Sequence, residues 1–135
     1  MREYITNLAV KLQGIPYRWG GSNPTSGFDC SGFVIWILQA FDILPSGDWT
    51  AADLEHVFLK TDDPLPGDLV FYGQGHASHT MMYLGTLDST HPLCIGASGG
   101  DSSTLTLDDA LAKGARVKIK DVHYRKDFRG YGKII

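Results

Sequence analysis

The stretch SGFDCSGFVIWILQAF, residues 26–41, joins a turn of small residues to the most apolar run of the chain. Asp29 suits the N-cap of a helix that continues to Phe41, since no proline or glycine interrupts the segment after Gly32. Residues 33–38 are apolar on every face of that helix, and a helix of this kind is normally enclosed by the rest of its domain. We therefore predict a buried central helix with Cys30 in its first turn.

Cys30 has two interpretations. Cysteine packs as a small hydrophobe and is often buried, so Cys30 could have a purely structural role in the core. In the first turn of a helix, however, free backbone N–H groups and the positive end of the dipole favour the thiolate, which is the reactive form. The same N–H groups can stabilise an oxyanion formed when the sulfur attacks a carbonyl. The position of Cys30 therefore favours a nucleophile.

A cysteine nucleophile needs a base, and the chain has five histidines: His56, His76, His79, His91 and His123. We expect His56, near the end of a short helix, and His123, after a charged strand, to lie at the surface. His79 opens the strand HTMMYLG after a glycine-containing turn. A strand-edge position fixes an imidazole while leaving it open to a cleft, so His79 is the predicted base.

A metal site is the alternative function for two of these histidines. His76 and His79 form an HxxH pair to which Cys94 could add a third ligand. The spacing across a turn is not a recognised ligand pattern, and no fourth ligand is evident. We predict neither a metal nor a cofactor.

The rest of the chain indicates an α+β domain with an antiparallel sheet packed on the central helix. Helical spacing covers Glu3 to Gln13, and Thr50 with Asp53 gives a capping-box start to a helix through Phe58. Further elements are expected as a loop at 15–27, strands in 64–73, 79–85, 92–98 and 115–122, a helix at 106–113 and an edge strand in the tail 128–135. In the strand at 115–122, Val117 and Ile119 should face inward. We predict one domain, residues 1–135.

Composition excludes several classes of protein. The net charge is −3 and lysine and arginine form no block, which argues against a nucleic-acid partner. No apolar run approaches the roughly 20 residues that span a bilayer. The N-terminal segment lacks the apolar region of a signal peptide, so we expect synthesis in the cytoplasm. Two cysteines predict free thiols rather than a disulfide framework.

Four motifs in order resemble the NlpC-type cell-wall cysteine peptidases, whose core is papain-like. They are GIPYRWGG at 14–21, FDCSGFV at 28–34, LPGDLVFY at 65–72 and SHTMMYLG at 78–85. The resemblance covers roughly residues 3–98. It implies hydrolysis of amide bonds in bacterial peptidoglycan stem peptides, and hence action at the cell wall.

The resemblance also implies roles for individual residues. Cys30 matches the family nucleophile and His79 the family base. Tyr17 matches a tyrosine that lines the active site near the oxyanion, and Asp29 and Ser31 match residues that form the pocket for the substrate residue before the scissile bond. Capping of the helix alone is the alternative role for Asp29, and core packing is the alternative for Tyr17.

The chain departs from the family where a third polar residue usually orients the base. The aligned position is Gly96, which offers only its backbone carbonyl. Ser98, two residues further on the same strand face, and His91, in the preceding turn, are the candidates to replace it.

Residues 97–120 resemble versions of this domain carried by bacteriophages and prophages. That similarity implies a phage-borne lysin with a tail or holin partner. Two alternatives to a wall peptidase stay open: an inactive phage or prophage structural component, and a related cysteine amidase or acyltransferase.

Overall fold

A computed structural model describes residues 1–88 and 90–135, and its core is the helix expected from residues 26–41. This helix, α2 (Cys30–Ala40), begins after Asp29, whose carboxylate accepts a hydrogen bond from the Gly32 backbone N–H at 2.7 Å. Its side chains from Phe33 to Leu38 are buried except for the partly exposed Trp36. The predicted cap and the buried central helix are both confirmed.

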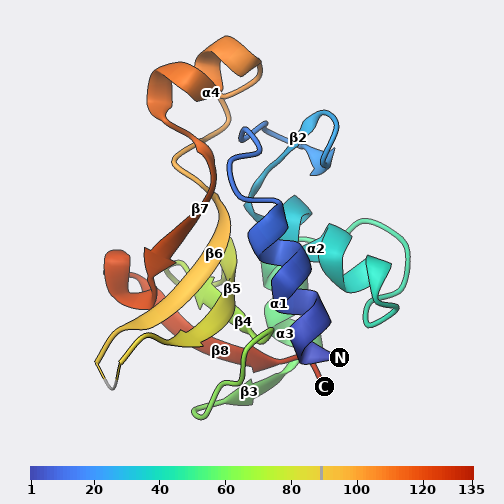
Figure 1. The fold of residues 1–135 in the computed structure, drawn as a ribbon, viewed down its shortest axis with the longest axis vertical. Coiled ribbons are helices and arrows are strands. Elements are labelled where there is room, and N and C mark those ends of the chain that lie inside the picture. The colour runs from blue at the N-terminus through green and yellow to red at the C-terminus, as the bar shows by residue number, and fades with distance from the viewer. Residues whose placement is uncertain (89) are drawn as a thin grey trace.

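A six-stranded sheet packs against α2, and every neighbouring pair of strands is antiparallel (Figure 1). In spatial order its strands are β3 (Leu59–Thr61), β8 (Phe128–Lys133), β4 (Leu69–Tyr72), β5 (His79–Thr86), β6 (Pro92–Ser98) and β7 (Arg116–Asp121). The α+β class and the antiparallel sheet are as predicted.

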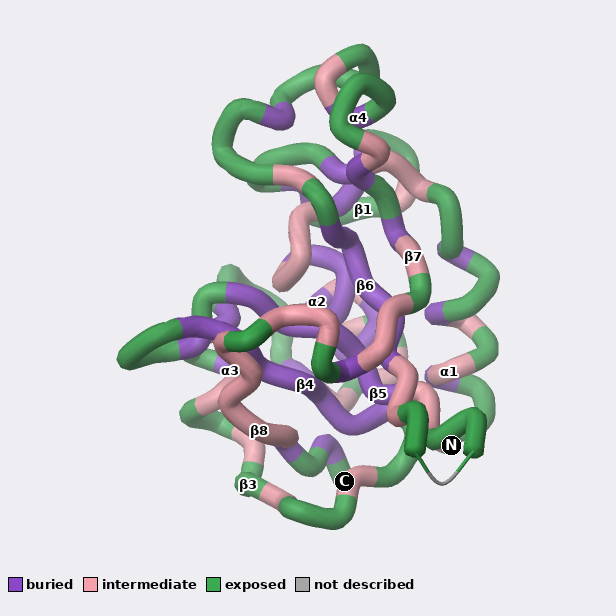
Figure 2. Tube along the Cα trace, turned by 90° about the vertical axis from the view of Figure 1, so that its left-hand side faces the viewer, coloured by how far each residue is buried: buried purple, intermediate pink, exposed green. Residues whose placement is uncertain are grey.

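The two faces of the sheet have different covers. One face packs on α2 and on α1 (Arg2–Lys11), with Met82 and Ile95 among its buried side chains. The other face carries an aromatic cluster of Tyr72, Met81, Tyr83, Cys94 and Val122, flanked by Tyr124, Phe128 and Tyr131. In Figure 2 the central strands β4, β5 and β6 are coloured as buried over most of their length. Because side chains alternate between faces along a strand, His79 shares the aromatic face with Met81.

The C-terminal tail does not form an edge strand, which corrects the sequence prediction. β8 lies inside the sheet between β3 and β4, and pairs with both of them. Gly132 allows this position, because a Cβ there would lie 2.8 Å from the Phe71 ring on β4. Val117 on β7 is buried as predicted, and Ile119 lies on the same face of that strand. Because β7 is the edge of the sheet on the far side, Ile119 remains 37% exposed.

The smaller elements follow their local signals. α3 (Ala51–Val57) and α4 (Leu107–Lys113) each begin with a threonine–aspartate capping box, and Gly114 ends α4 in the left-handed region at φ 64°. The predicted loop at 15–27 contains a two-stranded ribbon, β1 (Ser22–Asn23) and β2 (Gly27–Phe28), and a single turn of 3-10 helix, η1 (Val122–Tyr124), follows β7. None of the described helices is long and apolar enough to cross a membrane.

Candidate active site

Cys30 is the first residue of α2 and its thiol lies against the start of β5. The sulfur is 4.0 Å from the Ser78 carbonyl oxygen, and the backbone N–H of Thr80 also interacts with it. These two contacts lie on either side of His79 in the sequence. The fold therefore brings the predicted nucleophile, at the start of α2, against the backbone of the strand that carries the predicted base.

The pKa of the Cys30 thiol is raised to about 11, mainly by burial and in part by the neighbouring Asp29 carboxylate. Backbone N–H groups of Thr80, Ser31 and Cys30 act in the opposite direction but do not compensate. The sequence prediction of a thiolate favoured by the helix N-terminus is therefore wrong for the free protein. The helix end is present, but desolvation and a like charge outweigh it.

His79, the first residue of β5, is 8% exposed. Its Nε2 lies 2.8 Å from the Tyr124 hydroxyl, and its ring packs on Tyr72 with centroids 5.4 Å apart. Its pKa is lowered to about 3, mainly by burial and in part by the Arg125 cation. The imidazole is thus neutral and enclosed, rather than open to a cleft as the sequence suggested.

Gly96, which aligns with the family's third residue, has no side chain that could orient His79. Gly96 lies beside Met81, whose sulfur would be 2.5 Å from a Cβ at that position. His91 is exposed in the turn between β5 and β6 and pairs with Asp88 at 3.0 Å, so it does not replace the missing residue. Ser98 reaches the site only indirectly, since its hydroxyl lies 3.4 Å from that of Tyr124.

Tyr124 is the site residue that sequence reasoning missed. It belongs to η1, is 45 residues from His79 in the chain, and comes from a segment with no recognisable motif. Only the packing of η1 on the aromatic face of the sheet brings its hydroxyl to the imidazole. No local pattern in the sequence indicates this contact.

A cavity of about 330 Å³ opens beside Cys30. Its walls come from four segments: Tyr17 and Trp19, Asp29 to Ser31, Thr50 to Ala52, and His76 to Ser78. Tyr17, Asp29 and Ser31 therefore meet at Cys30, where the resemblance places them. Tyr17 is 5% exposed, and a Cβ at Gly100 would lie only 2.2 Å from its ring. The glycine allows the chain to pass close over this tyrosine.

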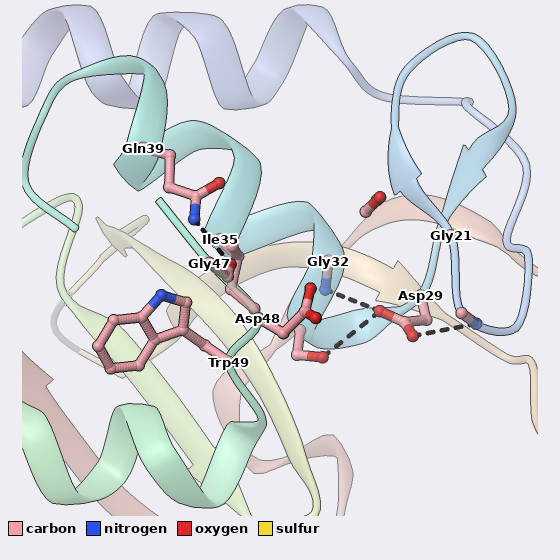
Figure 3. A pocket seen from close by; sticks show the side chains of 11 residues that line it. Gly21, Asp29, Gly32, Ile35, Gln39, Gly47, Asp48 and Trp49 are labelled. Atoms are coloured by element: carbon pink, nitrogen blue, oxygen red, sulfur yellow. Dashed lines mark hydrogen bonds between the residues drawn. The ribbon is translucent and has the colours of Figure 1, made fainter. Parts of the chain in front are cut away.

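The Asp29 carboxylate is held by three donors (Figure 3). Oδ1 accepts from the Gly32 N–H and, at 3.4 Å, from the Ser31 hydroxyl, while Oδ2 accepts from the Gly20 N–H at 3.1 Å. Burial raises its pKa, and the N–H donors lower it. A second cavity, of about 310 Å³, lies along the same carboxylate and extends to Asp48 and Trp49.

The residues of the metal alternative have separate surroundings. His76 is exposed in a turn, whereas His79 is bound to Tyr124. The Cys94 thiol is buried, 3.5 Å from the Lys120 carbonyl oxygen and 3.6 Å from the Tyr72 hydroxyl. Among residues 1–88 and 90–135, no group of three or more His, Cys, Asp or Glu side chains is arranged to hold a metal ion.

The arrangement of this sheet and its helices is shared with solved NlpC/P60 domains. The solved NlpC/p60 domain of the peptidoglycan hydrolase SagA superposes with a TM-score of 0.72 and 26% identity, covering 98% of both chains. The model of the NlpC/P60 family matches residues 14–122. The chain therefore belongs to the NlpC/P60 family.

Curated relatives share the same region. The bifunctional muramidase/DL-endopeptidase CwlT of Bacillus subtilis is 41% identical over 90 residues, which cover 62% of this chain and 26% of CwlT. The murein DD-endopeptidase MepH of Escherichia coli is 39% identical over 87 residues, covering 58% of this chain and 31% of MepH. Because the match spans only about a third of these relatives or less, a single domain over residues 1–135 stays a prediction.

One solved neighbour is not an enzyme. RipD from Mycobacterium tuberculosis, a non-catalytic NlpC/p60 domain protein adapted to peptidoglycan binding, superposes with a TM-score of 0.68 over 99% of this chain and 97% of RipD. Its identity of 17% supports the shared fold alone.

Proposed function

We propose that the chain is a cysteine peptidase that hydrolyses amide bonds in peptidoglycan stem peptides, with Cys30 as nucleophile and His79 as general base. The observation that carries the proposal is the Cys30 sulfur between the Ser78 carbonyl and the Thr80 N–H, on either side of His79. CwlT is named as a muramidase/DL-endopeptidase and MepH as a murein DD-endopeptidase, which supports the substrate class.

Acylation starts from a neutral pair, because at neutral pH the thiol is protonated and the imidazole is uncharged. With Nε2 next to Tyr124, Nδ1 is the nitrogen left to take the thiol proton. As the proton moves to His79, the sulfur forms a bond to the substrate carbonyl carbon. Collapse of the tetrahedral intermediate breaks the C–N bond, and His79 returns the proton to the leaving amine.

Deacylation uses the same base. His79 takes a proton from water as its oxygen attacks the thioester carbon, the C–S bond breaks, and the proton returns to the Cys30 sulfur. In both steps the oxyanion is stabilised by the Cys30 backbone N–H together with the Tyr17 hydroxyl. Asp29 and Ser31 receive the substrate residue before the scissile bond, and the Asp29 carboxylate faces its free amino group.

Digestion of purified cell walls tests the proposal. We expect the wild-type protein to release muropeptide fragments, identified by mass spectrometry, and Cys30→Ala to release none while keeping the same circular dichroism spectrum. Cys94→Ala is the matched control and should retain activity, since Cys94 is a buried thiol on β6 that does not line the cavity beside Cys30. Equal results for wild type and Cys30→Ala on several wall types would refute the proposal.

A non-catalytic, wall-binding role is the second candidate. The protonated Cys30, the enclosed His79 and the glycine at position 96 favour it, and RipD is a precedent within the fold. Under this role the protein would sediment with cell walls without releasing fragments, and Cys30→Ala would bind equally well. A related amidase or acyltransferase would instead be recognised by its products, because a transferred acyl group changes the product mass.

Action on peptidoglycan implies that the protein works at the bacterial cell wall. A bacteriophage or prophage source, with a tail or holin partner, rests on the resemblance of residues 97–120 alone. Sequencing the genes that flank this one tests that part of the proposal, since phage tail or holin genes should lie beside it.

A further inference from the structure

We propose that Tyr124 is the positioning residue of this site: its hydroxyl holds the His79 ring through Nε2 and thereby directs Nδ1 to Cys30. This inference rests on the proposed roles of Cys30 and His79. It assigns the orienting task to a side chain from η1, outside the strand that carries this residue elsewhere in the family.

The contact between Tyr124 and His79 has the geometry of a strong, enclosed hydrogen bond. The hydroxyl oxygen is 2.8 Å from Nε2, within the usual range for such bonds. The imidazole is 8% exposed, so water does not readily replace the tyrosine. Breaking the bond would leave a buried ring nitrogen without its partner, which is costly.

Tyr124 is itself held in place from three sides. Its ring packs edge-on against Tyr72 with centroids 5.5 Å apart, and the Lys120 ammonium lies 5.3 Å from its centroid on the side of β7. The Ser98 hydroxyl is 3.4 Å from the Tyr124 oxygen. A tyrosine fixed in this way can fix the imidazole in turn.

The glycine at position 96 explains why the orienting side chain comes from η1 and not from β6. With no side chain at Gly96, the Met81 sulfur occupies the space above β6 where a polar residue of that strand would extend. Instead, the Nε2 atom of His79 is contacted by the Tyr124 hydroxyl, from η1, which packs on the same face of the sheet. Gly96 and Tyr124 are therefore two parts of one arrangement.

The direction of the Tyr124 O–H bond can also select the tautomer of His79 that is able to act as a base. The Tyr124 O–H can point to Ser98, which leaves an oxygen lone pair to accept the Nε2–H of His79. A neutral imidazole with its proton on Nε2 has a free lone pair on Nδ1, as a base for the Cys30 thiol requires.

Tyr124→Phe tests the inference, because it keeps the ring and removes only the oxygen. We expect kcat for muropeptide cleavage to fall about 10- to 100-fold with KM within twofold of wild type, as for loss of a group that acts in the chemical step. Tyr131→Phe is the matched control, since Tyr131 flanks the same cluster, packs on Tyr83 and Phe128, and is not bonded to His79 within the described residues. It should leave kcat unchanged.

Nitrogen NMR of the histidine side chains provides a readout independent of cleavage. In the wild type the His79 ring should show one dominant tautomer, protonated on Nε2. Tyr124→Phe should shift the Nε2 resonance and mix the tautomers, whereas Tyr131→Phe should not. A merely structural tyrosine would leave the tautomer unchanged.

The outcomes separate this inference from the proposed function. Absence of cleavage by the wild type refutes the peptidase, while the tautomer measurement still decides whether Tyr124 sets His79. Full kcat and an unchanged tautomer in a cleaving Tyr124→Phe variant overturn the positioning role and leave the peptidase intact.

Discussion

Asp29 caps the helix whose first residue is Cys30, and the same carboxylate raises the pKa of that thiol. The two effects oppose each other at one position. The cap stabilises the helix end that would favour a thiolate, while its negative charge and the burial of the sulfur keep the proton in place. The free protein therefore presents a thiol and not a thiolate at neutral pH.

The first prediction concerns the reactivity of Cys30 with iodoacetamide. Because only the thiolate reacts and the pKa is about 11, the alkylation rate should rise about tenfold per pH unit up to pH 10. Mass spectrometry of peptides follows the modification. Cys94, which is fully buried, serves as the internal reference and should stay unmodified in the folded protein. A rate that levels off below pH 8 would contradict the raised pKa.

The second prediction separates the two roles of Asp29. Asparagine caps helices as well as aspartate but its amide nitrogen cannot accept from the Gly20 N–H, so Asp29→Asn should lower the free energy of unfolding by less than Asp29→Ala, which should lower it by about 1 kcal/mol. If the carboxylate faces a substrate amino group, Asp29→Asn should raise KM for muropeptides with a free N-terminus at least tenfold. An unchanged KM would show that Asp29 caps the helix but does not bind the substrate.

Asp29→Asn also tests the electrostatic effect on Cys30. Removing the charge should speed alkylation of Cys30 at pH 8, because the carboxylate disfavours the thiolate. An equal rate in both proteins would assign the raised pKa to burial alone.

The third prediction is that stability falls as the pH drops below 6.5. The pKa of His79 is about 3 in the folded protein against 6.5 as its ordinary value, so the unfolded chain binds the extra proton between these limits. Stability linked to His79 is complete above pH 6.5 and decreases by about 1.4 kcal/mol per pH unit below it. Urea unfolding at pH 7 and pH 5 should show a loss of roughly 2 kcal/mol from this residue.

His79→Gln is the reference for that measurement, since glutamine has no titrating group. The pH-dependent loss in the wild type should exceed the loss in His79→Gln by the amount stated. Parallel curves for the two proteins would show that His79 is protonated normally in the folded state.

The fourth prediction concerns Gly100, which passes over the Tyr17 ring. In Gly100→Ala the new methyl group would lie 2.2 Å from that ring, so the tyrosine or the loop has to move. We expect muropeptide cleavage to fall at least tenfold while the protein still unfolds cooperatively. The combined variant Gly100→Ala with Tyr17→Ala should be no worse than Tyr17→Ala alone, because the methyl group then has space.

The fifth prediction concerns Asp68, a carboxylate that is 1% exposed. It accepts hydrogen bonds from Arg2 at 2.9 Å, from the Leu65 N–H at 2.8 Å and from the Ile134 N–H at 3.0 Å. Asp68→Ala leaves two backbone donors and a cation without this partner, so we expect a loss of about 3 kcal/mol in unfolding free energy. Asp63→Ala, at an exposed position nearby, should change it by less than about 0.5 kcal/mol.

Local signals predicted most of the helical half of the fold. The Asp29 cap, the Thr50–Asp53 capping box and the glycine at position 114 each act within one turn of chain, so their physics is readable from adjacent residues. The order of strands in the sheet is set by pairing between distant segments. The interior place of β8 depends on β3 and on the close approach that Gly132 allows, and neither leaves a periodic pattern.

The site divides in the same way. Cys30 and His79 are recognised in the sequence from their motifs and positions, and in the structure the Cys30 sulfur lies against the backbone on either side of His79. The pKa of Cys30 and the contact of Tyr124 with His79 depend on burial and on packing across the sheet. Both properties result from contacts between segments that are distant in the chain, so the neighbouring sequence does not reveal them.

The interior position of β8 has a consequence for synthesis on the ribosome. The strand that joins β3 to β4 is the last of the sheet to be made, so residues 59–61 cannot be incorporated into it until residues 128–133 emerge. Until then, the outer edge of β4 is an unpaired strand edge, which is open to association with other chains. Nascent chains stalled before residue 128 should therefore be the species that chaperones bind and proteases remove.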